Sequence, residues 1–189
     1  MLVYVIRHGQ SEGNFLQAHS GQNGVPLTEK GRADARSAGR RLAGIAFDRV
    51  YASDTPRAVE TAAIALPDSH PEYDSRLREI DVGELTGHLI SECVETYGEE
   101  YVRNKSARDF TPYGGENHEM QYARVAAFME MLEEEPDCEN VAVFTHGGAI
   151  RCMMQYVFDL PKEKIRLLTE NGSVTVFAYK NGEWFLCLK

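Results

Sequence analysis

Residues 1–14, MLVYVIRHGQSEGN, contain a short apolar run that stops at an arginine and a histidine. The run at residues 2–6 has the length and the β-branched and aromatic composition of a buried strand. Arg7, His8 and Gly9 do not continue it, because charged groups and glycine are unfavourable inside a sheet. The sequence therefore predicts a buried first strand, with two polar side chains placed where that strand ends.

The composition is that of a globular chain. With 189 residues and 43% hydrophobic content, the chain is long enough to bury a substantial core, and we expect a single domain over residues 1–189. No apolar run approaches the roughly 18 residues of a membrane span, and no basic segment precedes a signal-like stretch. The 4 cysteines are widely spaced without a CxxC pair, which argues against a disulfide framework or a zinc site. We expect a cytoplasmic protein with reduced thiols.

The net charge is strongly negative. Lys and Arg number 20 against 29 Asp and Glu, which gives a formal charge of −9. This balance disfavours nonspecific binding to nucleic acid or to an anionic membrane, and no basic run offsets it. An anionic ligand must therefore be small and bound locally, since a few arginines in a walled cleft focus positive potential against the global sign.

Strand signals alternate with helix signals along the chain. In order they are a helix after the cap Thr28, a strand at 48–53, a helix capped by Ser53 or Asp54, a helix from Glu119 that stops by Pro136, a strand at 140–145, a helix at 147–158 and a hairpin at 173–189. This order predicts an α/β three-layer sandwich with a mostly parallel central sheet, helices on both faces and an antiparallel C-terminal edge. In such folds, ligands gather outside the carboxyl ends of the strands.

Residues 85–118 are the least regular part of the sequence. They are polar and interrupted by glycines, and only a short helix at about 89–102 is expected within them. We expect this segment to form a lid or rim over the ligand site.

Two histidines and an arginine are candidates for a ligand-binding or catalytic site. His8 and His146 each follow a predicted strand, so a parallel sheet would bring both into one crevice. Arg57 lies in the first turn of its helix, where the helix dipole disfavours a cation unless an anion binds beside it. Gly147 and Gly148 open the helix after His146 and expose backbone N–H groups there. Each feature also has a plain structural explanation: a packed histidine, a solvated arginine or a tight turn.

Short blocks of sequence, taken together and in order, resemble a known family. The blocks are RHGQSEGN (7–14), PLTEKG (26–31), SDTPRAVETA (53–62), LREIDVGELTG (77–87), YGGEN (113–117) and VFTHGGAIR (143–151). They resemble the histidine phosphatase superfamily, the phosphoglycerate mutase-like proteins. Within it, the chain is similar to the small bacterial phosphatases, such as broad-specificity phosphatases and α-ribazole phosphatase. The glycolytic mutases are longer, with a larger insertion before the second histidine and an added C-terminal tail.

The resemblance implies a role for each matching residue. His8 would be the nucleophile that attacks phosphorus and forms a phosphohistidine, which water then hydrolyses. Arg7 and Arg57 would bind the phosphoryl oxygens and, by like-charge repulsion, keep His8 unprotonated. His146 would be a further donor to the phosphoryl group, and Asn14 falls on a family phosphate contact.

The family also implies a proton donor for the leaving oxygen. Glu79 in LREID matches that acid, and Glu84, five residues later in the same block, is its competitor. Two departures from the family pattern stand nearby: Leu85 and Thr86 replace a Trp–Glu pair, and GGEN replaces GGES at residues 114–117. We expect both departures to alter the pocket rim rather than the chemistry.

Three other interpretations remain. The protein is a phosphoglycerate mutase, or a non-catalytic module that binds a phosphorylated ligand, or it uses His8, His146 and Glu79 as a metal-ligand set. The third is disfavoured because two flanking arginines repel a divalent cation. We expect no metal and no cofactor, a small phosphorylated metabolite as the partner, a monomer or homodimer, and Gly147 as part of the phosphate-binding turn. The sequence leaves the substrate open.

Overall fold

The computed structural model describes residues 1–135, 137–165 and 167–187, so Pro136 and the last two residues of the expected hairpin lie outside it. Within these residues, the strands are β1 Leu2–Arg7, β2 Arg49–Ala52, β3 Glu72–Tyr73, β4 Asn140–Thr145, β5 Val174–Lys180 and β6 Glu183–Cys187. The α-helices are α1 Glu12–Leu16, α2 Glu29–Leu42, α3 Pro56–Ala65, α4 Ile90–Ala107, α5 His118–Glu133 and α6 Gly147–Phe158.

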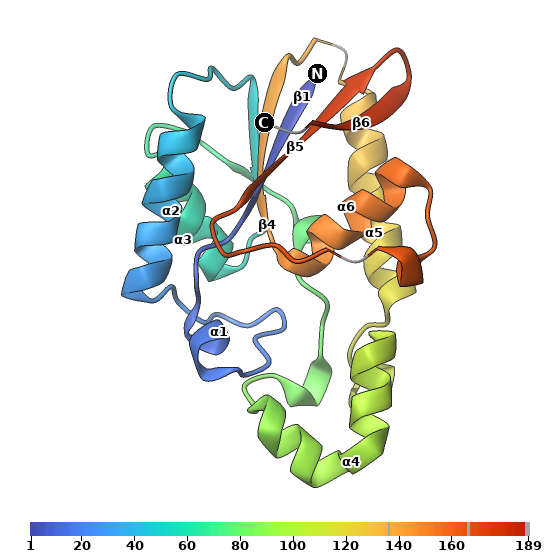
Figure 1. Cartoon of the computed structure of the whole chain (residues 1–189). Helices are drawn as coiled ribbons and strands as arrows, with labels where there is room; N and C mark the ends of the chain where they lie inside the picture. The colour runs from blue at the N-terminus through green and yellow to red at the C-terminus, as the bar shows by residue number, and fades with distance from the viewer. Residues whose placement is uncertain (136, 166, 188–189) are drawn as a thin grey trace.

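The strands form one sheet in the order β3-β2-β4-β1-β5-β6 (Figure 1). Strands β1 to β4 are mutually parallel where they pair, while β5 runs antiparallel to β1 and β6 antiparallel to β5. The expected mostly parallel sheet with an antiparallel C-terminal edge is therefore confirmed. In the register of β1 with β4, Arg7 pairs with Thr145, so both histidines leave the sheet at the same edge.

Helices cover both faces of the sheet, which confirms the three-layer sandwich (Figure 1). On one face, α5 and α6 pack against side chains such as Val5, Val143 and Phe177. On the other face, α2 and α3 pack against Ile6 and Phe144 among others. Successive strand residues point to opposite faces, so the continuous apolar run at 2–6 supplies both cores. Burial of each large apolar side chain contributes about 1.5–3 kcal/mol.

The start of α3 differs from the sequence-based expectation. Thr55, rather than Ser53 or Asp54, is the N-cap, and its side chain makes no capping hydrogen bond. Ser53 instead lies against His146, and Asp54 forms an ion pair with Arg78. The two residues with good capping chemistry are therefore used in contacts between distant segments, and Pro56 at the first helical position sets the helix start.

The segment 85–118 is more regular than expected. Helix α4 spans Ile90–Ala107, five residues beyond the predicted end, with a non-helical break at Gly98 where φ is 58°. The glycine and the exposed charges around it hide the helix from pattern reading. Short elements α1 and β3 were also not predicted, because five and two residues carry too little periodicity. Among the described residues, no helix combines the length and apolar character that crossing a membrane requires.

Candidate active site

His8 lies directly after β1, where its backbone N–H donates to the carbonyl of Thr145 at 2.9 Å. The side chain is only 4% exposed and lines a cavity of about 270 Å³. Its Nδ1 lies 2.7 Å from the carbonyl oxygen of Gly9. A carbonyl only accepts, so Nδ1 carries the ring proton and Nε2 carries the free lone pair. This geometry fixes the tautomer that a nucleophilic imidazole needs.

The imidazole ring of His8 is neutral at neutral pH. Burial, followed by the charge of Arg57 and then of Arg7, lowers the pKa of His8 to about 3, although the hydrogen bond to Gly9 opposes the shift. The expected like-charge effect of the arginines is present, but burial is the larger cause. A neutral imidazole retains its nucleophilic lone pair at neutral pH.

His146 lies beside His8, with the ring centroids 5.0 Å apart and the planes inclined at 60°. Its Nε2 is 2.9 Å from the Ser53 hydroxyl and 3.1 Å from the Thr55 hydroxyl, and its Nδ1 is buried without a partner. Burial and then Arg57 hold the pKa of His146 well below its usual value. The ring is fully buried and does not line the cavity, so a direct contact with a phosphoryl group stays a prediction, as it does for the neighbouring Gly147.

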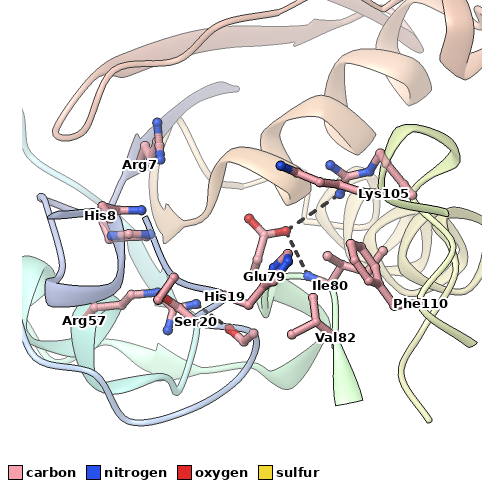
Figure 2. A pocket seen from close by; sticks show the side chains of 14 residues that line it. Arg7, His8, His19, Ser20, Arg57, Glu79, Ile80, Val82, Lys105 and Phe110 are labelled. Carbon is pink, nitrogen blue, oxygen red and sulfur yellow. Dashed lines mark hydrogen bonds and ion pairs between the residues drawn. The ribbon is translucent and has the colours of Figure 1, made fainter. Parts of the chain in front are cut away.

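Arg57 and Arg7 line the cavity on either side of His8 (Figure 2). Arg57 is 1% exposed, and its guanidinium donates to the carbonyls of Asn23 at 3.0 Å and Gly21 at 2.6 Å. Arg7 donates one terminal N–H to the Thr169 carbonyl. The Nε of each arginine is buried and has no hydrogen-bond partner among the residues that the structure describes. These contacts exclude the interpretation of Arg57 as a solvated arginine and leave several donors unused beside His8.

Asn14 also lines the cavity, as predicted. Its Oδ1 accepts hydrogen bonds from Ser11 and, at 3.1 Å, from Nδ2 of Asn171. Its own amide N–H groups donate to no acceptor within the described part of the chain. Asn171 also donates to the carbonyl of His8 at 3.0 Å. Nothing in the sequence pattern marked Asn171, because it acts through a contact across 157 residues.

Ser20 is a candidate that sequence reasoning missed. It lines the cavity near Arg57, and its hydroxyl oxygen is buried without a hydrogen-bond partner (Figure 2). Buried hydroxyls are usually paired. The oxygen is packed against Gly13, so it contacts a ligand in the cavity only after the side chain rotates toward Arg57. Its position in the polar loop at 17–26 gave no periodic signal.

Glu79 enters the cavity opposite His8 and is held by several donors (Figure 2). Its Oε1 accepts from the Ile80 N–H at 2.8 Å and from Gln121 at 3.1 Å, and its Oε2 accepts from the Gly148 N–H at 3.0 Å. Arg108 lies 3.8 Å from Oε1. Burial would raise the pKa of Glu79, but the charge of Arg108 and these hydrogen bonds lower it to about 2. Glu79 is therefore a carboxylate in the free protein.

The backbone around Glu79 is fixed from two sides. Arg124 on α5 donates to the carbonyls of Arg76, Arg78 and Glu79 at 2.6–3.0 Å. A side chain at position 148 would collide with Glu79 Oε1, so only glycine leaves room for the carboxylate there. The sequence predicted free backbone N–H groups after His146. One of them, the N–H of Gly148, donates to the Glu79 carboxylate.

The competitor Glu84 is exposed and does not line the cavity. Leu85 is buried in a third apolar cluster with residues such as Val82 and Tyr101. Asn117 caps α5 by accepting from the Met120 N–H. Leu85, Thr86 and Asn117 do not line the cavity themselves, although Leu85 packs with the lining residues Val82 and Phe110, so their effect on the rim stays a prediction. Leu85 and Asn117 are explained by packing and helix capping.

Further side chains complete the lining of the cavity. His19, Ile80, Val82, Lys105, Arg108 and Phe110 line it. Three of these, Lys105, Arg108 and Phe110, come from residues 85–118; that this segment forms a lid or rim stays a prediction. His19 is hydrogen-bonded to the Tyr101 hydroxyl at 2.6 Å and stacked edge-on against Phe110. Burial, followed by the charges of Lys105 and His88, lowers its pKa to about 4.

The alternative of a metal centre finds no assembled ligand set. In residues 1–135, 137–165 and 167–187, no three His, Cys, Asp or Glu side chains lie close enough together to hold an ion. Glu79 directs both oxygens at N–H donors instead, and Arg7, Arg57 and Arg108 line the same cavity. The site therefore presents arginine donors, an unprotonated imidazole nitrogen of His8 and, across the cavity, the Glu79 carboxylate.

Comparison with known proteins agrees with this arrangement. The family model of the histidine phosphatase superfamily (branch 1) matches residues 3–188. A 2,3-bisphosphoglycerate-dependent phosphoglycerate mutase from Methylobacterium sp. is 36% identical over 174 residues, which cover 87% of this chain and 84% of the mutase.

Solved structures share the architecture over almost the full chain. The α-ribazole phosphatase of Shigella flexneri superposes with a TM-score of 0.91 over 100% of this chain and 95% of that one; at 23% identity the likeness is one of fold. A mycobacterial glucosyl-3-phosphoglycerate phosphatase gives a TM-score of 0.85 at 26% identity, covering 99% and 97% of the two chains.

Proposed function

Because the chain belongs to the histidine phosphatase superfamily (branch 1), we propose that it is a metal-independent phosphomonoesterase that forms a phosphohistidine on Nε2 of His8. The observation that carries the proposal is the state of His8. It is neutral, its proton is fixed on Nδ1 by Gly9, and its lone pair lies between two arginines with unused donors. The substrate is a small phosphorylated metabolite, and the cavity of about 270 Å³ holds its phosphoryl group and part of the leaving group.

In the first step, Nε2 of His8 attacks phosphorus as the bond from phosphorus to the leaving oxygen breaks. Negative charge on the equatorial oxygens is stabilised by Arg7, Arg57 and the free amide of Asn14. The hydroxyl of Ser20, once its side chain rotates from Gly13 toward the cavity, donates to the same group. The leaving oxygen takes a proton from Glu79, which lies on the opposite side of the cavity from His8.

In the second step, Glu79 accepts a proton from water, and the hydroxide formed attacks phosphorus. The bond from phosphorus to Nε2 breaks, which releases inorganic phosphate and neutral His8. Because Glu79 is ionised in the free protein, the proton for the first step arrives with the substrate. The second pKa of a phosphate monoester is about 6, so less of the substrate carries this proton at higher pH. The value of kcat/KM should therefore decline as the pH rises above that pKa.

Trapping of the intermediate tests the proposal. A ³²P-labelled phosphomonoester is mixed with the protein and excess EDTA, quenched in alkali and analysed for label on the chain. We expect an acid-labile, alkali-stable label in the wild type. We expect no label in His8→Ala, together with a loss of p-nitrophenyl phosphate hydrolysis of roughly 10⁴-fold or more. Label retained in His8→Ala, or turnover abolished by EDTA, would contradict the proposal.

A second candidate, phosphoglycerate mutase, is favoured by the name of the 36% identical relative. A mutase must keep its phosphohistidine until an acceptor takes the phosphoryl group, so water has to be excluded. Incubation with 3-phosphoglycerate separates the two functions. Release of inorganic phosphate supports the phosphatase, and isomerised phosphoglycerate without phosphate release supports the mutase.

A further inference from the structure

Gln121 is a polar side chain on the buried side of α5. It lies one turn before Val125, and both residues are 0% exposed. It does not line the catalytic cavity, and it lies outside the blocks of sequence that resemble the family. Because a buried amide is costly unless it is hydrogen-bonded, the partners of Gln121 indicate why the position is polar.

The Gln121 amide connects Arg108, at the C-cap of α4, to Glu79 in the catalytic cavity. Nη2 of Arg108 donates to Oε1 of Gln121 at 2.7 Å, and Nε2 of Gln121 donates to Oε1 of Glu79 at 3.1 Å. A guanidinium only donates and a carboxylate only accepts, so the two neighbours fix the orientation of the amide. A flipped amide would place its NH2 group against the guanidinium and its oxygen against the carboxylate.

The same amide holds Arg108 out of hydrogen-bond contact with Glu79. Nη2 of Arg108 lies 3.8 Å from Oε1 of Glu79, beyond the roughly 2.7–2.9 Å of a charge-assisted hydrogen bond. A direct bond from the guanidinium would favour the ionised form of Glu79 and oppose its protonation. Gln121 takes Nη2 as its own donor, so Glu79 accepts from a neutral amide instead of a charged group.

The hydrogen bonds of Glu79 distinguish its two oxygens. Oε1 accepts from the Ile80 N–H at 2.8 Å as well as from Gln121, whereas Oε2 accepts, among the described residues, only from the Gly148 N–H at 3.0 Å. A carboxylate oxygen has about two lone-pair directions, so Oε1 is saturated and Oε2 keeps one direction free. The oxygen bonded to Ile80 points away from His8, and the other oxygen lies on the His8 side (Figure 2).

This asymmetry suits a group that gains and loses a proton. A proton enters and leaves at Oε2 while both donors to Oε1 stay in place, so the transfer needs no rearrangement of these hydrogen bonds. In the first step the O–H bond at Oε2 breaks, and the proton goes to the leaving oxygen as that oxygen departs from phosphorus with the bonding electron pair. In the second step Oε2 takes a proton from the attacking water.

We propose that Gln121 is a positioning residue for proton transfer by Glu79, because it fills Oε1, keeps Arg108 at a distance and leaves Oε2 to exchange the proton. The inference rests on the proposed function, in which Glu79 is the acid of the first step and the base of the second. Since Gln121 does not line the cavity, its effect on the first step should depend on how much the leaving group needs a proton.

Gln121→Met tests this role, because methionine has nearly the length of glutamine but no amide. Phosphorylation of His8 is measured in single turnover with butyl phosphate and with p-nitrophenyl phosphate. We expect the step to slow by roughly 10- to 100-fold with butyl phosphate, as for a displaced catalytic group. With p-nitrophenyl phosphate it should slow by less than about 3-fold, because a nitrophenolate leaves without a proton.

Gln155→Met is the matched control. The Gln155 side chain on α6 accepts from His118 on α5 at 2.7 Å and does not line the cavity. Its replacement therefore removes a glutamine hydrogen bond to α5 without altering the partners of Glu79, and it should show no contrast between the two substrates.

A double-mutant cycle provides a second measurement. If Gln121 acts through Glu79, the double variant Glu79→Gln/Gln121→Met should phosphorylate His8 from butyl phosphate no more slowly than Glu79→Gln alone. Two independent effects would instead multiply. If Gln121→Met unfolds, as judged by circular dichroism, Gln121→Leu takes its place in both measurements.

The outcomes separate the inference from the proposed function. Unchanged rates or equal losses for the two substrates in Gln121→Met refute the role of Gln121, and so do multiplied losses in the double variant; the phosphatase then stands. If the wild type forms no phosphoenzyme from either substrate, the proposed function fails and the inference fails with it.

Discussion

The two ends of the catalytic cavity are built in different ways. The phosphoryl end consists of Arg7, His8 and Arg57, which are held by a strand terminus and a helix terminus of the central sandwich. The leaving-group end consists of side chains such as Glu79 and Arg108, which come from a loop and from the C-cap position of α4. At the first end His8 and Arg57 are 4% and 1% exposed and Arg7 is half-buried, whereas at the second Glu79 is 25% and Arg108 22% exposed.

The difference indicates which part of the substrate each end contacts. Groups fixed by the sheet keep one geometry whatever ligand enters, so they suit the transferred phosphoryl group, which is the same in every substrate. Groups on loops and helix ends vary more easily and suit the part of the substrate that changes. The comparison predicts that substitutions at the first end harm every substrate alike, while those at the second depend on the leaving group.

Arg57→Ala should give the largest effect of the substitutions that preserve His8. We expect kcat/KM to fall by roughly 10²- to 10³-fold for all substrates, because a donor to the transition-state oxygens is lost. Position in the first helical turn alone suggests a slightly more stable helix. The contacts to Gly21 and Asn23 predict the opposite, a loss of roughly 1–3 kcal/mol of unfolding free energy.

Steady-state kinetics and thermal unfolding of the same preparation check both parts, with the exposed Arg40→Ala on α2 as control. A large loss of stability with unchanged kcat/KM would make Arg57 a structural residue. The loss of activity in Arg57→Ala should also be equal for alkyl and aryl phosphates. A loss of activity that depends on the leaving group would contradict the assignment of Arg57 to the phosphoryl end.

Glu79→Gln should give a loss of activity that depends on the leaving group. An alkoxide is a poor leaving group without a proton, so phosphorylation of His8 by an alkyl phosphate should slow by roughly 10²- to 10⁴-fold. A nitrophenolate leaves readily, so the same step with p-nitrophenyl phosphate should slow much less. The amide must also turn its NH2 group toward one of the donors Ile80, Gly148 or Gln121, which lowers stability.

Single-turnover measurement of the phosphorylation step isolates the effect, because Glu79 also acts in the second step and slows overall turnover for both substrates. Glu84→Gln, at an exposed carboxyl of the same block, is the matched control and should show no contrast. Equal losses for the two substrates in Glu79→Gln would mean that the acid has been misassigned.

The same division explains what could be predicted from the sequence. His8 and Arg57 were visible because each violates a local rule: a polar residue ends a buried strand, and a cation sits at a helix N-terminus. The layers and sheet directions followed from alternating strand and helix patterns. Contacts between loops and distant segments could not be predicted from the sequence. An example is the set of hydrogen bonds from Arg124 to backbone carbonyls at 76–79. Ser20 and Asn171 belong to the same class.

Acid stability provides a third test, at the phosphoryl end. The pKa of His8 is about 3 in the folded protein and roughly 6.5 in an unfolded chain. Between these values the unfolded state binds the additional proton, so the free energy of unfolding falls as the pH falls through this window. His146 acts in the same direction. Glu79, with its pKa lowered to about 2, adds a further loss below about pH 4.5.

His8→Ala should therefore have a shallower decline of unfolding free energy between pH 6.5 and pH 4 than the wild type, whatever its stability at pH 7. Urea unfolding at several pH values measures this slope. The exposed His70→Ala is the control, and its slope should match that of the wild type. An unchanged slope in His8→Ala would show that His8 is not held neutral by the fold.

Ser20→Ala should give the smallest effect on activity and the clearest sign. If the hydroxyl donates to the phosphoryl group, its loss should lower kcat/KM by about 10-fold, equally for alkyl and nitrophenyl phosphates, since Ser20 lies toward Arg57. Its oxygen is buried without a partner in the free protein. Removing it therefore costs no hydrogen bond, and thermal stability should stay constant or rise, whereas the exposed Ser91→Ala on α4 should change neither quantity. A lower melting temperature with unchanged kcat/KM would instead place Ser20 among the structural residues of the loop, and the phosphoryl end would then rely on the arginines and Asn14 alone.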